Sequence, residues 1–156
     1  MKLGILAVGR LRGGPERELV DDYLTRLTRT GRPLGLGPAD VVEVDDRKGG
    51  GMAGEGALIL KALPEGAAVC ALDERGRQMS SPDLAQRLAD WRDQGRGEAV
   101  FVIGGADGLA QDVRDRADMA LSLGPMVWPH MLVRVMLAEQ LYRAATILAG
   151  SPYHRN

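Results

Sequence analysis

The end of the chain combines three side chains that can do chemistry. After Ser151 and Pro152 come Tyr153, His154 and Arg155, just before the last residue. An imidazole accepts or donates a proton near neutral pH, a guanidinium stabilises negative charge, and a phenol ring stacks on flat groups. Chain ends are usually frayed, but a proline limits the freedom that this tail loses on ordering. We therefore treat these residues as candidates for catalysis.

A long apolar helix, expected over residues 129–149, precedes the tail. Glu139 and Arg143 lie four residues apart on it and can form an ion pair, so Arg143 joins the catalytic candidates. Most of the remaining circumference is apolar, which predicts burial on more than one side, against the sheet and against a second subunit. Arg134 lies on the apolar side and needs either a buried partner or a path to solvent. The sequence leaves both open.

Strand and helix patterns alternate about five times before this helix. Apolar or alternating runs predict strands, one helix should begin at Pro15 with Leu19, Tyr23 and Leu27 on one face, and Ser81-Pro82-Asp83 is typical of another helix start. This alternation predicts an α/β fold in one domain, residues 1–156, with a mostly parallel sheet and helices on both faces. The expected strands are 2–9, 39–46, 67–74, 98–105 and 118–124, and the other expected helices are 57–64, Ser81–Asp93 and 109–117.

Glycine recurs where the predicted strands end. In open parallel sheets ligands bind beyond the carboxyl ends of the strands, and glycine allows backbone to approach a ligand closely. These glycines could equally serve only as turn residues. The loop at 122–130 is more distinctive, because its prolines, methionine and tryptophan make it stiff, apolar and able to hold a flat ring. The strand ends in question are Gly9-Arg10, Leu72-Asp73, Gly104-Gly105 and Gly124-Pro125.

Composition excludes several classes of protein. The net charge of −1 gives no overall field for nucleic acid, so RNA binding requires local patches or assembled subunits. Cys70, the only cysteine, lies in an apolar run and reads as a core residue in a reducing compartment. With two histidines and one cysteine a zinc site is not expected, and no metal is predicted. No signal peptide or membrane span is visible, so we expect a cytoplasmic protein.

A glycine-rich stretch at 47–56 offers a competing function. Gly49 to Gly54 fits G-x-G-x-x-G, and Asp73 follows about twenty residues later, as in nicotinamide-binding folds. However, Asp45 and Asp46 precede the glycines and would repel a pyrophosphate, and the phosphate-loop pattern fails because no Lys-Ser/Thr pair follows. We expect instead a flexible surface loop.

Three segments together resemble the ribosomal RNA large subunit methyltransferase H family, small members of the SPOUT superfamily. They are "VIGGADGL" (102–109), "LSLGPMVWPHMLVRVMLAEQLYRAATIL" (121–148) and "SPYHRN" (151–156). The segments "MKLGILAVGR", "ALDERG" and "SSPDLAQRLADW" are also similar, so the resemblance spans essentially the whole chain.

The resemblance implies a C-terminal trefoil knot, a homodimer and methyl transfer from S-adenosylmethionine. The implied acceptor is N3 of a pseudouridine in the helix 69 loop of 23S rRNA, on assembled ribosomes. The implied cofactor contacts follow the third, fourth and fifth strands. On this chain they fall on Leu72, Gly104, Gly105, Gly124, Pro125, Met126, Val127, Trp128 and Pro129.

The chain departs from the family pattern at three places. Ala106-Asp107 replaces a common proline-glutamate pair, and Ser151 replaces a common histidine, which weakens any mechanism that needs two tail histidines. Trp128 is bulkier than expected and could reshape the adenine pocket.

For the implied reaction, the tail can be assigned roles. Tyr153 could stack on the base, His154 could act as base or donor, and Arg155 could hold a phosphate or carbonyl. In one hypothesis the tail orders on RNA, over the partner subunit's cofactor; in the alternative, Tyr153 only packs on the last helix. A basic rim of Arg10, Arg12, Arg26, Arg29 and Arg32 could bind RNA or be a solvated helix face. A ribosome assembly factor without catalysis, and a methyltransferase for tRNA or another rRNA base, stay open.

Overall fold

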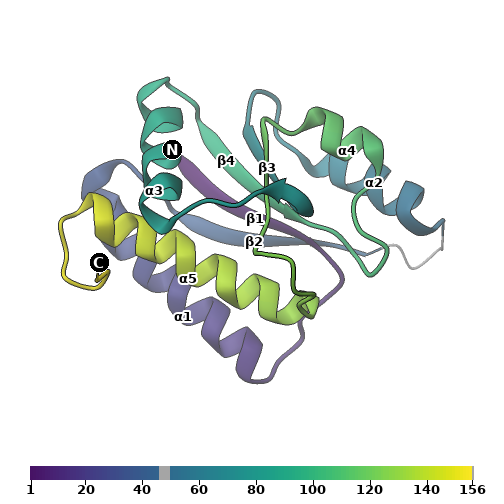
Figure 1. Ribbon diagram of the computed structural model, residues 1–156, viewed down its shortest axis with the longest axis horizontal. Helices are drawn as coiled ribbons and strands as arrows, with labels where there is room; N and C mark the ends of the chain where they lie inside the picture. Colours follow the sequence, from purple (N-terminus) through teal and green to yellow (C-terminus); the bar gives the residue numbers. More distant parts are fainter. Residues whose placement is uncertain (46–49, 156) are drawn as a thin grey trace.

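Five parallel strands form the central sheet, in the order β2-β1-β4-β3-β5 (Figure 1). The computed structural model describes residues 1–45 and 50–155. The predicted parallel α/β sheet is confirmed, and the carboxyl ends of all five strands lie at one edge. The strands are β1 Lys2–Val8, β2 Ala39–Val44, β3 Ala68–Arg77, β4 Glu98–Ile103 and β5 Met119–Leu121.

Helices cover both faces of the sheet, as predicted. In β4, Ala99, Phe101 and Ile103 belong to one core cluster and Val100 and Val102 to another. This alternation places a separate apolar core on each face. The first cluster is covered by α1 Pro15–Gly31, α3 Ser81–Asp93 and α5 His130–Leu148, and the second by α2 Gly51–Ala62 and α4 Gln111–Arg116. A short 3-10 helix, Arg32–Leu34, follows α1. Cys70 is fully buried in the first cluster, as expected.

Two local expectations are wrong. The glycine-rich stretch is helical from Gly51 onward, whereas the sequence predicted a loop there and a helix only from residue 57. A Cβ at Gly56 would lie 2.8 Å from Ala110 Cβ, so glycine at this position allows α2 to approach the start of α4. Residues 46–49 of the glycine-rich prediction lie outside the described residues. In α1, the buried face is Val20, Leu24 and Leu27, while Leu19 is 44% exposed.

The N-cap of α3 is Ser80, not Ser81 as predicted. The Ser80 hydroxyl accepts from Asp83 N (3.1 Å) and the Asp83 carboxylate accepts from Ser80 N (3.4 Å), a capping box. Ser81 Oγ instead donates to Gln140 Oε1 of α5 (2.6 Å). Sequence spacing alone did not separate adjacent serines.

This difference gives the first testable prediction. Ser80→Ala should lower the free energy of unfolding by about 1 kcal/mol, because a helix N–H loses its acceptor. Ser80→Asn, which keeps a capping oxygen, should stay close to the parent chain in urea denaturation. Equal stability of the alanine variant and the parent would contradict this assignment.

The last helix, α5, lies between α1 and α3 on one face of the sheet (Figure 1). Leu137, Ala138, Leu141 and Ala144 are buried there. Its wide apolar surface is therefore partly explained within one chain, although Met131 and Leu132 in its first turn remain 48% and 40% exposed. Within the described part of the chain, no helix is long and apolar enough to cross a membrane.

Candidate cofactor pocket and C-terminal tail

A cavity of about 690 Å³ lies at the carboxyl edge of the sheet, between the second half of β3, the loops after β4 and β5, and the start of α5. β3 continues to Arg77, so the predicted strand end at Leu72-Asp73 lies inside the strand. Most of the predicted cofactor residues line it: Leu72, Gly104, Gly105, Gly124, Met126, Val127, Trp128 and Pro129. Pro125, the remaining member of that set, is exposed and does not line it. Three segments that are distant in sequence therefore meet around one space.

Backbone conformation explains the glycines in two of these loops. Gly124 has φ of 101°, a conformation that L side chains rarely adopt, and its N–H donates to Ser122 Oγ (3.1 Å). A Cβ on Gly104 would lie 2.9 Å from the Gly108 carbonyl oxygen, so the turn after β4 closes only with glycine there. These glycines therefore make turns, and the turns form the cavity wall.

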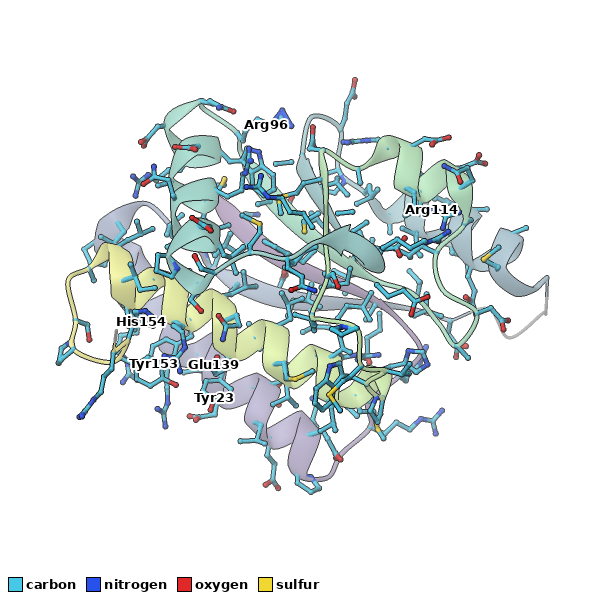
Figure 2. The ribbon with its side chains drawn as sticks, in the orientation of Figure 1. Tyr23, Arg96, Arg114, Glu139, Tyr153 and His154 are labelled. Atoms are coloured by element: carbon cyan, nitrogen blue, oxygen red, sulfur yellow. The ribbon has the colours of Figure 1, made fainter. Side chains whose placement is uncertain are left out.

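The cavity wall is mixed in polarity and more negative than positive. It includes the carboxylates of Asp73, Glu74 and Asp107 and the guanidinium of Arg75. Asp73 accepts from Arg75 N (3.0 Å), and the Arg114 guanidinium, labelled in Figure 2, lies 3.7 Å from it. This excess of negative charge suits a cationic ligand.

Several wall residues were not predicted. Apolar surface comes from three of them, Leu109, Leu123 and Val133. The fourth is His130, the first residue of α5, noted earlier only as one of two histidines. The position of His130 directly after the proline-rich loop was a usable signal. The three apolar residues carried no signal that distinguished them from core. Among residues 1–45 and 50–155, no group of His, Cys, Asp and Glu side chains is arranged to hold a metal ion.

The tail folds back on the second half of α5 (Figure 2). Tyr153 Oη donates to Glu139 Oε1 (3.0 Å), and its ring lies 4.8 Å from both the Tyr142 ring and the Arg143 guanidinium. Arg143 donates to the same carboxylate oxygen through Nε (2.9 Å) and Nη2 (2.6 Å), so the predicted Glu139–Arg143 pair is confirmed. In a single chain Tyr153 thus packs on the last helix, the simpler of the two alternatives.

The tail contacts constrain which groups can move a proton. Burial and the hydrogen bond to Glu139 raise the pKa of Tyr153 to about 12, so its phenol stays neutral. His154 Nδ1 lies 3.3 Å from Arg143 Nη1. Because a guanidinium only donates, Nδ1 accepts, and a neutral ring then carries its proton on Nε2. In this arrangement His154 presents an N–H donor.

The cavity and the tail lie at opposite ends of α5. Thirteen residues separate His130 from Arg143, roughly 20 Å of helix. Of the four catalytic candidates, Tyr153, His154 and Arg143 are in contact with one another, whereas Arg155 is exposed. Within one chain, the structure brings none of the four to the cavity.

Comparison with known proteins places the chain in a family. A family described as predicted SPOUT methyltransferase matches residues 1–154. A protein of Roseobacter denitrificans named ribosomal RNA large subunit methyltransferase H is 70% identical over the full length of both chains. One of the same name from Ruegeria pomeroyi is 69% identical over 99% of each chain. The chain belongs to the ribosomal RNA large subunit methyltransferase H family.

A solved structure supports the fold of this SPOUT methyltransferase. A probable methylase family protein from Haemophilus influenzae matches with a TM-score of 0.52 and 13% identity, over 99% of this chain and 70% of that one. At this identity the match supports the fold alone. The trefoil knot stays a prediction from family resemblance.

Arg134 of this methyltransferase finds a buried partner, which decides the alternative left open by the sequence. It is 4% exposed, and its Nη1 donates to Glu43 Oε2 on β2 (2.6 Å). Its Nη2 donates to the carbonyl oxygen of Gly9, directly after β1 (2.7 Å). A buried guanidinium thus ties the first turns of α5 to the ends of β1 and β2.

The buried pair predicts a pH effect on stability. Burial raises the pKa of Glu43, but hydrogen bonds from Arg134 and Leu11 N outweigh it and lower the pKa below 4.5. A depressed carboxyl pKa stabilises the fold above the pKa of the unfolded chain, and this contribution is lost as pH falls through the folded pKa. Glu43→Gln should therefore lower the free energy of unfolding at pH 7, and the gap should narrow below about pH 4.5. A constant gap across urea titrations from pH 7 to 3 would contradict it.

The predicted basic rim does not form one patch. Arg10 and Arg12 precede α1, beside the start of α5, whereas Arg26 and Arg29 lie in the second half of α1, near the tail. Arg32 begins the following 3-10 helix. Arg26 forms an ion pair with Asp22 (3.1 Å), and its guanidinium lies over the Tyr23 ring. The Arg26 guanidinium is therefore already engaged in contacts within α1.

Proposed function

We propose that this methyltransferase transfers a methyl group from S-adenosylmethionine to N3 of a pseudouridine in helix 69 of 23S rRNA, on cytoplasmic ribosomes. The observation that carries the proposal is the shared cavity, because the three loops implied by family resemblance and the start of α5 all line it. The name of the relatives, ribosomal RNA large subunit methyltransferase H, supports large-subunit rRNA over tRNA.

The cavity fits the proposed cofactor in size and charge. Its volume of about 690 Å³ lies within the range of small-molecule sites. Asp73, Glu74 and Asp107 outnumber Arg75 on its wall, which favours a ligand with a sulfonium and an ammonium group. Trp128 and Met126 offer apolar surface for a purine ring. These loops also favour an enzyme over an assembly factor that lacks catalysis.

When bound, S-adenosylmethionine supplies an activated methyl group. The chain must then align the acceptor nitrogen while the N3 proton passes to solvent water, and it must stabilise the negative charge that remains on the base. In the proposed roles, His154 Nε2–H and the Arg155 guanidinium donate to the base carbonyl oxygens. Tyr153, neutral and held by Glu139, offers its ring to the base. Arg143 fixes the orientation of both His154 and Tyr153.

The active unit is proposed to be a homodimer. The tail lies roughly 20 Å of helix away from the cavity of its own chain. Exposed apolar side chains cluster beside that cavity: Met126 (70% exposed), Val127 (88%), Trp128 (39%), Met131 and Leu132. A contiguous exposed apolar surface is typical of a protein–protein interface. If this surface packs across a two-fold axis that passes near the middle of α5, the start of α5 in one subunit faces the tail of the other, so the tail lies over the partner's cavity.

The proposed function is tested on ribosomes from cells that lack this gene. They are incubated with purified protein and S-adenosylmethionine, and the helix 69 fragment is analysed by mass spectrometry. We expect one added methyl group on the pseudouridine. Methylation at another base, or none at any base despite cofactor binding, would contradict the proposal.

A further inference from the structure

The connection from β1 to α1 is anchored at its centre by three polar contacts. The Gly9 carbonyl accepts from Arg134 (2.7 Å), Leu11 N donates to Glu43 Oε2 (2.6 Å), and the Leu11 carbonyl accepts from Arg17 Nη1 (2.7 Å). Leu11 itself is 5% exposed. This short segment is therefore held inward at its middle residue.

The anchor contains an ion pair between Arg134, which is buried, and Glu43, whose side chain is 25% exposed. Replacing such a pair by apolar residues is often neutral or stabilising, so stability alone is a weak explanation for it. Both Arg134 and Glu43 contact the segment directly. Arg134 directly follows Val133, which lines the cavity. The hydrogen bond from Arg134 to Gly9 therefore attaches the connection from β1 to α1 to the part of α5 that forms the cavity wall. Figure 1 shows the connection from β1 to α1 passing beside the start of α5.

Two arginines flank the anchored residue and face solvent. The Arg10 side chain is 55% exposed and lies only 4.0 Å from Asp45, at the limit of an ion pair. Arg12 is exposed and forms no hydrogen bond or ion pair with residues 1–45 or 50–155. Because the backbone of Leu11 is held by hydrogen bonds, Arg10 and Arg12 face solvent on a backbone that is already ordered. Little conformational entropy of this backbone is therefore lost when the two arginines bind a ligand. Preorganised charge of this kind lowers the cost of binding an anion.

We propose that Arg10 and Arg12 bind phosphates of the RNA strand that flanks the methylated base, and that Arg134 and Glu43 are positioning residues for this segment. The inference rests on the proposed function only in taking RNA as the substrate. The cofactor cavity fixes where the base must enter, and the two arginines lie beside its last-helix wall. Arg26 and Arg29 in the second half of α1, and Arg32 in the 3-10 helix that follows, lie away from this wall and are not included.

The test uses the full-length protein with Arg10→Gln and Arg12→Gln combined. Large ribosomal subunits from cells lacking the gene are the substrate, and KM for the subunit, kcat and cofactor affinity are measured. We expect KM to rise roughly tenfold at low salt, with kcat and cofactor affinity unchanged. The slope of log affinity against log salt should become shallower by roughly 1.5, since two phosphate contacts are lost. Glu43→Gln should raise KM by a smaller factor and leave kcat unchanged.

A matched control removes the same charge elsewhere. Lys2 and Lys61 are exposed, and Lys2 begins β1 at the opposite edge of the sheet. Lys2→Gln with Lys61→Gln should leave KM and the salt slope unchanged. An equal change in the control, or an unchanged KM and slope in the arginine variant, would overturn the proposal. The KM of the Glu43→Gln variant is interpreted only if its circular dichroism spectrum matches that of the parent. If the Glu43→Gln variant does not fold, the result for the arginine variant alone decides.

The outcome separates this inference from the proposed function. If the parent protein methylates helix 69 and the arginine variant does so with unchanged KM, the inference fails alone. If the parent methylates no RNA, the proposed function fails. The salt dependence of binding to large subunits then still decides whether the two arginines contact RNA.

Discussion

Replacing Gly124 with valine should weaken the binding of S-adenosylmethionine by at least tenfold. Gly124 has φ of 101°, and a β-branched residue is strongly disfavoured there, at a cost of roughly 1–3 kcal/mol. Apart from its two chain neighbours, no heavy atom of residues 1–45 or 50–155 lies within 4 Å of the position a Cβ would take, so the effect comes from backbone strain and not from a clash. Relaxing that strain would move the loop that carries Met126, Val127 and Trp128. Titration calorimetry with the cofactor measures the loss.

Gly95 offers a matched control for this substitution. It has φ of 82° and open space around its Cβ position, but it follows α3 and precedes β4, at the opposite edge of the sheet. Gly95→Val should lower the melting temperature to a similar extent and leave cofactor affinity unchanged. Wild-type affinity in the Gly124 variant would show that the loop after β5 does not form the cofactor site.

Deleting residues 152–156 should lower turnover by at least a hundredfold while cofactor affinity stays within twofold of the parent. Positioned proton donors and charge-stabilising groups contribute roughly 10²–10⁴ in rate, and the deletion removes Tyr153, His154 and Arg155 together. The tail does not line the cavity of its own chain, so the cofactor keeps its main contacts.

A milder substitution distinguishes the contribution of the Tyr153 hydroxyl to turnover from the contribution of its ring. Tyr153→Phe removes the hydrogen bond to Glu139 and keeps the stack on Tyr142, so turnover should fall far less than in the deletion. Unchanged turnover in the truncated protein would remove the tail from the mechanism. Lost cofactor binding in it would instead give the tail a role in the pocket.

The sequence correctly predicted those features, such as strands and strand-end loops, that depend on residues close together in the chain. Strand positions followed from apolar runs, and the alternation of Phe101 and Val102 between two cores follows from strand geometry. The cavity-forming loops were found through glycine and proline at strand ends. In each case neighbouring residues in the chain carried the information.

The misses depended on contacts between distant segments. The segment from Gly51 to Gly56 is a poor helix former, yet it is helical, and its Gly56 packs closely against Ala110, which is distant in sequence. Arg134 found Glu43 ninety-one residues away, and no periodicity predicts that pairing. The distance between the tail and the cavity of the same chain depends on where both ends of α5 lie relative to the sheet, which the sequence pattern does not give.

The central claim is that the cavity of one subunit works with the tail of the other. The direct measurement mixes two impaired variants, Gly124→Val and the chain lacking residues 152–156, under conditions that allow subunit exchange. The cofactor concentration is kept low enough that the Gly124 variant alone gives no measurable methylation. Half of the dimers are then mixed, and each has one intact cavity facing one intact tail. We predict methylation at about one quarter of the parent rate. No recovery after verified exchange would show that each subunit uses its own tail and would contradict the account.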